Sequence, residues 1–344
     1  MSNQNFNTLK QIPMVSIALC THNGDEFLSE QLKSIQNQSL QPNEIIICDD
    51  NSSDRTLEII HQFSEQLPIK LYQNIPALGT IKNFEYAVSL CMNEIIFLCD
   101  QDDYWLPQKI ETLVNYLNEN LSKEVVFSNA LIVNHELQDL QMTMWEKVRF
   151  WEEEIEEWKN GKALDLLLTG NRVTGCTVAM RKTFAEKSRP FPATIHPDFI
   201  HDGWIGILAS LNNEIGFVAE PLVLYRQHQG QQVGVIEKER EKIYVHSRFS
   251  RSRDKKLGPF IEKGNLYFNL LNHININYPE LKDKTKSLQR ISEHYQLRSN
   301  LQKNRLKRII PIFKNFYTGN YHRYQNLGSN WYGVYLAILG DLLE

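Results

Sequence analysis

The sequence has 344 residues, 42% of them apolar, which is enough to build one large domain or one domain with an appendage. Its net charge of −4 is unevenly distributed, with acidic residues in excess before about residue 235 and basic residues in excess after it. This asymmetry predicts two functional regions. No segment approaches the ~20 consecutive apolar residues of a membrane-spanning helix, and residues 1–10 lack the apolar stretch of a signal peptide. These features argue against an integral membrane protein and predict a cytoplasmic location.

The five cysteines favour a reducing compartment. Their number is odd, no two are spaced as C-x-x-C, and most lie within apolar runs. We expect them to be small core residues.

The first 130 residues alternate between short apolar runs and amphipathic stretches. Strands are expected at 15–20, 45–48, 69–72, 95–99 and 125–127. Helices are expected at 26–36, 54–66, 81–91 and 107–118. This order predicts an α/β fold, with a Rossmann-like, mostly parallel sheet and helices on both faces.

The pattern becomes less regular after residue 140. Residues 144–160 read as one surface helix with an apolar face, and a loop at 170–175 leads into a strand at 176–180. A helix at 201–211 precedes two strands, at 215–219 and 222–225. Beyond about residue 236 the pattern is helical and basic.

Three polar clusters follow the first, second and fourth expected strands. They are Thr21-His22-Asn23-Gly24, Asp49-Asp50-Asn51 and Asp100-Gln101-Asp102-Asp103. In parallel sheets ligands bind outside the carboxyl ends of the strands. The sequence therefore predicts one binding site at this edge.

The third cluster holds three carboxylates in four residues. Like charges at this spacing raise one another's pKa unless a hard cation lies between them. Mg²⁺ and Mn²⁺ bind carboxylate oxygens together with substrate phosphates, and Asp100 and Asp102 are the natural ligands. The G-x-G-x-x-G and P-loop fingerprints are both absent, so a bound diphosphate would need such a metal.

These motifs, together with His201-Asp202, resemble in their order those of the family 2 nucleotide-sugar glycosyltransferases with the GT-A fold. The resemblance spans roughly residues 13–234. It implies a nucleotide-sugar-binding and catalytic domain at 1–234, followed by a basic, mainly helical C-terminal region at 235–344 that it does not cover.

The resemblance also implies site residues. The nucleotide sugar would be bound by Thr21, His22, Asn23, Asp50, Gly79, Lys82, Asn83, Asp100, Gln101 and Arg226. The metal would be held by Asp100, Asp102 and His228. The general base would be Asp202, and the acceptor side would include Gly175, Cys176 and Trp204.

Each role has a structural alternative. Asp202 and Asp103 could each cap a helix, and His228 could be an ordinary surface histidine. The loop at 170–175 could be simple turn chemistry.

A sugar hydroxyl needs a carboxylate to accept its proton, and the departing diphosphate needs a metal to stabilise its charge. One base opposite the leaving group gives a single displacement with inversion. The runs around Asp100, Cys176 and Arg226 look most like bacterial rhamnosyltransferases of surface-polysaccharide synthesis. This implies dTDP-L-rhamnose as donor and a saccharide or lipid-linked saccharide as acceptor.

Alternative functions remain. One is a transferase of the same fold that uses a UDP-hexose, and another is a non-catalytic partner subunit of a glycan-assembly complex. An aspartyl phosphatase is disfavoured, because Tyr104 stands where that class has Thr or Val.

The basic tail includes Arg305–Lys314 and the aromatic-rich segment Trp331–Leu343. We expect it to contact the anionic inner face of the plasma membrane. The alternative is a helical appendage that packs on the catalytic domain or forms a homodimer. No nucleic-acid module is present in the tail, so nucleic-acid binding is not expected.

Overall fold

The computed structural model describes residues 12–197, 199–228, 231, 252–324 and 331–343. These residues form two compact units that are interleaved along the chain. The first unit draws on residues 1–144, 173–191 and 214–226, and the second on 145–172, 192–213 and 227–344. The division by contacts therefore does not follow the single boundary predicted after residue 234.

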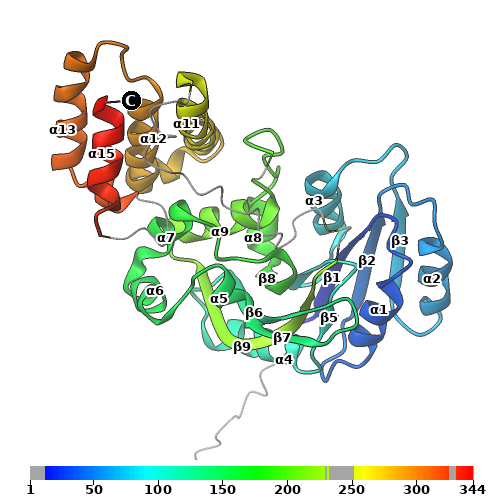
Figure 1. The fold of residues 1–344 in the computed structure, drawn as a ribbon. Helices are drawn as coiled ribbons and strands as arrows, with labels where there is room; N and C mark the ends of the chain where they lie inside the picture. The colour runs from blue at the N-terminus through cyan, green and yellow to red at the C-terminus, as the bar shows by residue number, and fades with distance from the viewer. Residues whose placement is uncertain (1–11, 198, 229–230, 232–251, 325–330, 344) are drawn as a thin grey trace, which may run out of the picture. The chain divides into compact units, whose positions relative to one another are not determined.

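The first unit is built on one sheet of nine strands (Figure 1). The strands are β1 (Val15–Thr21), β2 (Glu44–Asp49), β3 (Ile69–Gln73), β4 (Ile95–Cys99), β5 (Tyr104–Trp105), β6 (Val125–Val133), β7 (Asp139–Thr143), β8 (Val178–Arg181) and β9 (Ile215–Arg226). Their order is β3-β2-β1-β4-β8-β6-β9-β5, with β7 paired to β6. The β3-β2-β1-β4 half is parallel, and β8 joins it to the other half by antiparallel pairing.

Helices α1 (Leu28–Gln36), α2 (Thr56–Phe63), α3 (Thr80–Leu90), α4 (Lys109–Glu119) and α8 (Lys182–Lys187) belong to the same unit. In α1, the buried Leu28, Leu32 and Ile35 recur at helical spacing. The apolar run of β2 is buried along its whole length, as expected for a strand covered on both faces. The predicted α/β fold class is confirmed.

Two strand predictions were wrong in detail. The structure has one continuous β9 where two strands were expected, because a register shift against β6 accommodates Pro221 instead of ending the strand. The sequence pattern also missed β7, which is mostly exposed and polar and therefore lacks a buried apolar face.

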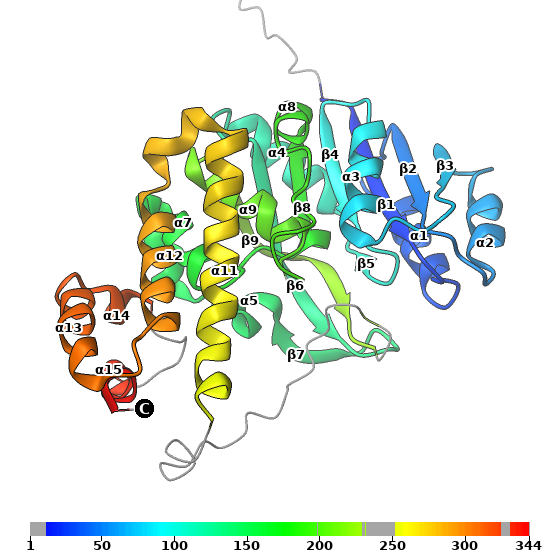
Figure 2. The ribbon, with the colours of Figure 1, turned by 90° about the horizontal axis from the view of Figure 1, so that it is seen from above.

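The second unit is helical. It comprises α6 (Glu152–Glu157), α7 (Ala163–Thr169), α9 (His201–Leu211), α11 (Arg253–Asn277), α12 (Lys286–Ser299), α13 (Ile309–Tyr317), α14 (Asn320–Arg323) and α15 (Gly333–Leu343). Figure 2 shows α11, in yellow, running alongside α12. Within the residues that the structure describes, no helix combines the length and apolarity needed to cross a membrane.

The single surface helix predicted at 144–160 was wrong. The structure has a short α5 (Met144–Lys147), then α6, then a π-helical turn, and Arg149 adopts a left-handed φ of 59° after α5. Trp145 and Trp158 are buried, whereas Trp151 is 54% exposed. The tryptophans therefore do not share one face of a continuous helix.

The C-terminal helices enclose a core of their own, formed by Leu301, Ile312, Tyr321 and Val334. A buried ion pair anchors α15, in which the Arg298 guanidinium donates to both carboxylate oxygens of Asp341, at 2.7 and 3.1 Å. The predicted helical C-terminal region is therefore confirmed. Four of the five cysteines are also buried as expected, and Cys20 is half-buried.

Candidate active site

The polar clusters at 21–24, 49–51 and 100–103 lie at one edge of the sheet. Residue Thr21 at the end of β1 is in register with Asp49 at the end of β2, and β4 pairs with the other side of β1. Since these three strands are parallel, their carboxyl ends meet there. The structure therefore brings together the residues expected to bind the nucleotide sugar that follow β1, β2 and β4.

Thr21 and Asp49 connect the ends of β1 and β2 to the loop after β2 through hydrogen bonds. The Thr21 hydroxyl is buried and donates to Asp49 Oδ1 at 2.8 Å, while the main-chain N–H of Ser52 donates to Asp49 Oδ2 at 2.9 Å. The Thr21 side chain thus helps to position the loop after β2. Its role in binding the nucleotide sugar stays a prediction.

Asp50 binds the segment that precedes α3. Its carboxylate accepts hydrogen bonds from Asn74 Nδ2 at 3.0 Å and from the main-chain N–H groups of Leu78 and Gly79 at 2.7 and 2.8 Å. Gly79 has a φ of 80°, a conformation that favours glycine. A carboxylate has about four acceptor positions, so these three bonds leave Asp50 room for one further donor.

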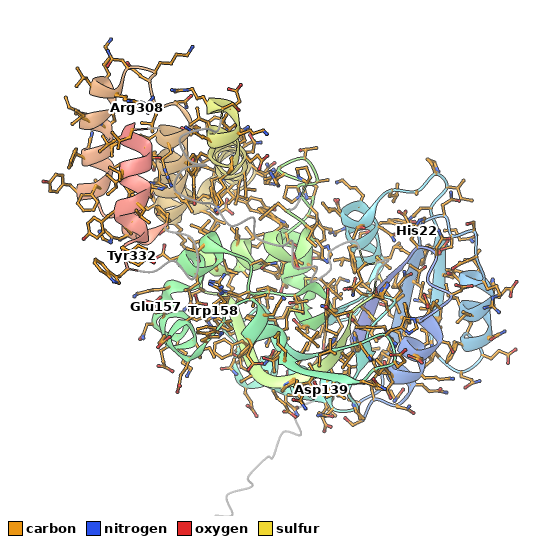
Figure 3. The ribbon with its side chains drawn as sticks, in the orientation of Figure 1. His22, Asp139, Glu157, Trp158, Arg308 and Tyr332 are labelled. Carbon is orange, nitrogen blue, oxygen red and sulfur yellow. The ribbon has the colours of Figure 1, made fainter. Side chains whose placement is uncertain are left out.

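Gln101 joins the loop after β4 to the loop after β1. Its side-chain amide accepts from the His22 N–H at 2.9 Å and donates to the His22 carbonyl at 3.1 Å. A Cβ on Gly24 would lie 2.2 Å from Gln101 Oε1, so only glycine allows this approach. His22 is exposed at this edge (Figure 3), and its Nδ1 lies 2.7 Å from the Asp50 carbonyl oxygen. Asn23, with a φ of 46°, continues the same loop.

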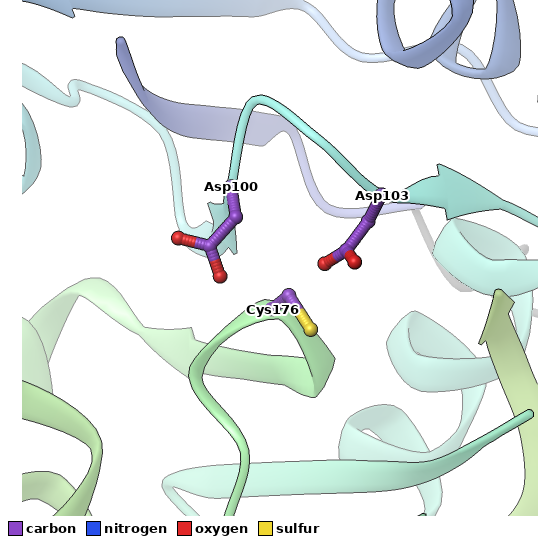
Figure 4. A group of neighbouring side chains, drawn as sticks. All are labelled: Asp100, Asp103 and Cys176. Carbon is purple, nitrogen blue, oxygen red and sulfur yellow. The ribbon is translucent and has the colours of Figure 1, made fainter. Parts of the chain in front are cut away.

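The acids after β4 converge with a cysteine (Figure 4). Ligand atoms of Asp100, Asp103 and Cys176 all lie within 4.8 Å of one another. Asp103 is buried, and this burial, followed by the charge of Asp102, raises its pKa to about 7. Asp103, for which a helix-capping role was the alternative, thus lies close to Asp100. The role of Asp102 as a metal ligand stays a prediction.

The ligand atoms of this acid group suit a hard cation. Asp100 and Asp103 offer carboxylate oxygens, which Mg²⁺ and Mn²⁺ prefer. Burial and the charge of Asp103 raise the pKa of the Cys176 thiol, so its sulfur stays protonated and is a poor ligand for such ions. Cys176 and the neighbouring Gly175, both expected on the acceptor side, are buried in the first unit.

Arg226 holds the acid loop in place. Its Nε donates to the Asp102 carbonyl at 2.8 Å, and its main-chain N–H donates to Asp103 Oδ1 at 3.2 Å. The guanidinium also binds Glu30 and stacks 4.5 Å from the centre of the Phe27 ring. The Arg226 side chain is buried among these partners and holds the loop in place. Its expected role in binding the nucleotide sugar stays a prediction.

Lys109 is a site residue that the sequence analysis missed. It is completely buried at the start of α4, and its Nζ donates to the Cys176 carbonyl at 2.5 Å and lies 3.5 Å from the centre of the Trp105 ring. Burial lowers its pKa to about 8. One sequence signal pointed to it, because Lys109 lies one turn before Leu113 and so falls on the buried face of the helix.

Asp202 begins α9 in the second unit. It is 8% exposed, and its Oδ1 accepts the main-chain N–H of Gly203 at 2.5 Å. The preceding His201 is buried, which lowers its pKa to about 4 and keeps the ring neutral at pH 7. Asp202 also lines a cavity in this unit.

The remaining predicted site residues differ in burial and in their hydrogen-bond and ring contacts. Trp204 was expected on the acceptor side, but it is fully buried, with its ring centre 5.1 Å from that of His273. Asn83 is buried and donates to the Cys48 carbonyl at 2.9 Å. Lys82 pairs with the adjacent Glu85. His228 is half-buried after β9, and its role stays a prediction.

Comparisons with known proteins agree with this arrangement. Residues 16–186 match the model of glycosyl transferase family 2. An uncharacterised protein of Mycobacterium bovis is 26% identical over 220 residues, which cover 62% of this chain and 59% of that relative. The dTDP-rhamnosyl transferase RfbG of Shigella flexneri is 26% identical over 228 residues, covering 63% of this chain and 73% of RfbG.

Among solved structures, residues 1–349 of S. aureus TarS in complex with UDP share the fold. The TM-score is 0.53 at 15% identity, and the alignment covers 82% of this chain and 91% of that one. This agreement confirms the expected GT-A fold. The family match contains β1 to β4 together with the whole acidic edge. Residues 16–186 of the chain form a glycosyl transferase family 2 domain.

Proposed function

We propose that the protein is an inverting glycosyltransferase that moves a hexosyl group from a nucleoside-diphosphate sugar to a saccharide or lipid-linked saccharide in cell-surface polysaccharide synthesis. The observation that carries the proposal is the acidic edge of the family 2 domain. The carboxylates of Asp100 and Asp103 meet there, and Asp50, at the same edge of the sheet, can accept one further hydrogen bond.

In this proposal the loops after β1 and β2 bind the nucleobase. The remaining acceptor position of Asp50 takes the imide N–H of uracil or thymine, and the exposed His22 ring stacks on the base. The acid loop binds the diphosphate side through Asp100 and Asp102. Mg²⁺ or Mn²⁺, when bound there, would stabilise the charge of the leaving diphosphate.

Asp202 serves as the general base. It accepts the proton of the acceptor hydroxyl as that oxygen attacks the anomeric carbon. The Gly203 N–H bonded to Asp202 Oδ1 fixes the orientation of the carboxylate. A single base gives one displacement and inversion at the anomeric carbon.

For the donor we propose an L-rhamnosyl group from dTDP-L-rhamnose. The support is the motif resemblance together with the 26% identity to a protein named as a dTDP-rhamnosyl transferase. A UDP-hexose is the competing donor, since WfgD of Escherichia coli, named as a UDP-Glc-using glucosyltransferase, is 29% identical over 122 residues, 36% of this chain and 47% of that protein. Asp50 cannot separate the two bases, because uracil and thymine present the same imide.

We also propose that α13, α15 and the adjoining Trp331 and Tyr332 contact an anionic membrane surface. Tyr317 and Trp331 are more than 80% exposed, and Tyr332 lies on the same helical group as Arg308 (Figure 3). No acidic residue occurs between Glu293 and Asp341. The exposed cations of that stretch are Lys303, Arg305, Lys307, Lys314 and Arg323. Aromatic rings flanked by cations suit the headgroup region of anionic lipid.

The function is tested by a thermal-shift screen of nucleotide sugars with and without Mn²⁺, followed by an assay of sugar transfer. A bound donor raises the melting temperature by mass action. Asp100→Asn should reduce the Mn²⁺-dependent shift, whereas Asp139→Asn, on the exposed strand β7, should retain it. The absence of any donor-induced shift and of donor hydrolysis would oppose the proposal and favour a non-catalytic partner subunit.

A further inference from the structure

The second unit contains a cavity of about 310 Å³ that is lined from α7, α9 and α11. Its floor is formed by Leu167, Ile207, Tyr267 and Leu270, all of which are buried. Asp202 also lines it, at the start of α9. The C-terminal helical region therefore supplies one wall of the cavity through α11.

The floor is mostly hydrocarbon. Leu167, Ile207 and Leu270 carry no polar atoms, and the Tyr267 hydroxyl donates its proton to the main-chain oxygen of Leu168 at 2.6 Å. A ligand hydroxyl against the three aliphatic side chains would lose its hydrogen bonds to water without replacement. This part of the cavity therefore favours an apolar group.

The rim is polar. Asn171, His196, Glu262 and Lys263 all line the cavity, and none of them is fully buried. Amide, imidazole, carboxylate and ammonium groups can each bind sugar hydroxyls. The cavity thus suits a small ligand that has hydroxyls on one side and an apolar substituent on the other.

We propose that this cavity is an acceptor subsite for a saccharide that carries a methyl group, either a 6-deoxyhexose or an N-acetyl sugar. The inference rests on the proposed function in one respect, which is the role of Asp202 as the base beside the acceptor hydroxyl. The methyl group lies on the floor, the hydroxyls face the rim, and Leu266 on α11 contributes to the selection of the sugar.

Two matched pairs of glycosides test the cavity without any need for turnover. Methyl α-L-rhamnoside and methyl α-L-mannoside differ only in the hydroxyl at C6, and methyl N-acetyl-β-D-glucosaminide and methyl β-D-glucoside differ in the acetamido group. Ligand-observed NMR titration of the full chain should give at least about tenfold tighter binding for the rhamnoside than for the mannoside, or for the N-acetylglucosaminide than for the glucoside. The pair that responds identifies the class of sugar. Equal binding within both pairs, or no binding at all, would overturn the proposal.

A pair of variants on α11 links that preference to the cavity. Leu266→Trp fills the space and should weaken binding of the preferred glycoside at least about tenfold. Phe268→Trp is the control, since Phe268 is 45% exposed and does not line the cavity. Leu266→Gln, which adds an amide at similar volume, should reduce the discrimination within the pair. Unchanged binding in both Leu266 variants would contradict the proposal.

Donor-induced thermal shifts, recorded on the same proteins, separate this inference from the proposed function. Both Leu266 variants should keep the donor shift, which also shows that they fold. If no nucleotide sugar raises the melting temperature of the unsubstituted protein, the proposed function fails. The glycoside preference and its loss in Leu266→Trp still decide what the cavity binds.

Discussion

Arg226 donates a hydrogen bond from Nε to the main-chain oxygen of Asp102 over 2.8 Å, and this bond ties the end of β9 to the acid loop. Its guanidinium is buried and also pairs with Glu30. Removal of the charge would leave the Asp102 carbonyl without this partner. We expect Arg226→Met to lower the free energy of unfolding by about 3 kcal/mol, measured by urea denaturation.

The control for this prediction is Arg55→Met. The Arg55 side chain is 74% exposed and lies 3.4 Å from Asp25, so its loss should cost no more than about 0.5 kcal/mol. Equal losses in the two variants would show that Arg226 does not hold the acid loop.

Gly24→Ala should weaken donor binding. The added Cβ would lie 2.2 Å from Gln101 Oε1 and would displace the amide that pairs with the main chain of His22. We expect a loss of about tenfold in donor affinity, equivalent to about 1.4 kcal/mol, by isothermal titration calorimetry. Because the clash requires the Gln101 side chain, adding Gly24→Ala to Gln101→Ala should cost much less.

Gly258→Ala is the matched control, since a Cβ at Gly258 meets nothing within 4 Å. It lies inside α11 and should leave donor affinity unchanged while favouring the helix. A Gly24→Ala variant that binds donor normally would separate the loop geometry from nucleotide binding.

Lys109 should make stability rise with pH in the alkaline range. Burial lowers its pKa to about 8 in the folded protein, against about 10.4 in an unfolded chain. Between these values the unfolded state binds more protons, so the free energy of unfolding increases as the pH rises. From pH 8 to 10.4 the free energy of unfolding of the unsubstituted protein should rise by about 2.5 kcal/mol relative to that of Lys109→Met, measured by urea denaturation at each pH. A difference that stays constant would contradict the low pKa.

Trp331→Ser should weaken membrane binding. Trp331 is 81% exposed at the start of the segment that carries α15, whereas Trp151, 54% exposed near α6, lies outside that segment. In flotation with vesicles that contain anionic lipid, Trp331→Ser should lower the bound fraction several-fold, and Trp151→Ser should not. If the unsubstituted protein failed to float at physiological salt, the membrane proposal would be wrong. A dimer in light scattering would then favour the homodimer.

The parallel half of the sheet could be predicted because its strands are continuous apolar runs. Ile45, Ile46 and Ile47 are fully buried, and only a strand covered on both faces needs such a run. The shared edge of the polar clusters followed from the same topology. The acids at 100–103 could be recognised because their positions depend on the end of a single strand.

The contacts that hold the acid loop in place could not be predicted, because the residues that make them lie far apart in the sequence. Arg226 binds Asp102 and Glu30, which are 124 and 196 residues earlier. The residues next to Arg226 in the sequence do not indicate these contacts, so a contact with the nucleotide sugar was the simpler interpretation. The burial of Trp204 could not be predicted for a similar reason, since it depends on His273 and Tyr278 of the C-terminal region.

The most direct test of the central claim is a comparison of donor binding and sugar transfer in Asp202→Asn. The purified full chain is supplied with dTDP-L-rhamnose or a UDP-hexose, Mn²⁺ and a panel of acceptor glycosides. We expect Asp202→Asn to keep the donor-induced thermal shift while transfer falls by at least about a hundredfold, the contribution typical of a general base. Near-normal transfer by Asp202→Asn would contradict the account.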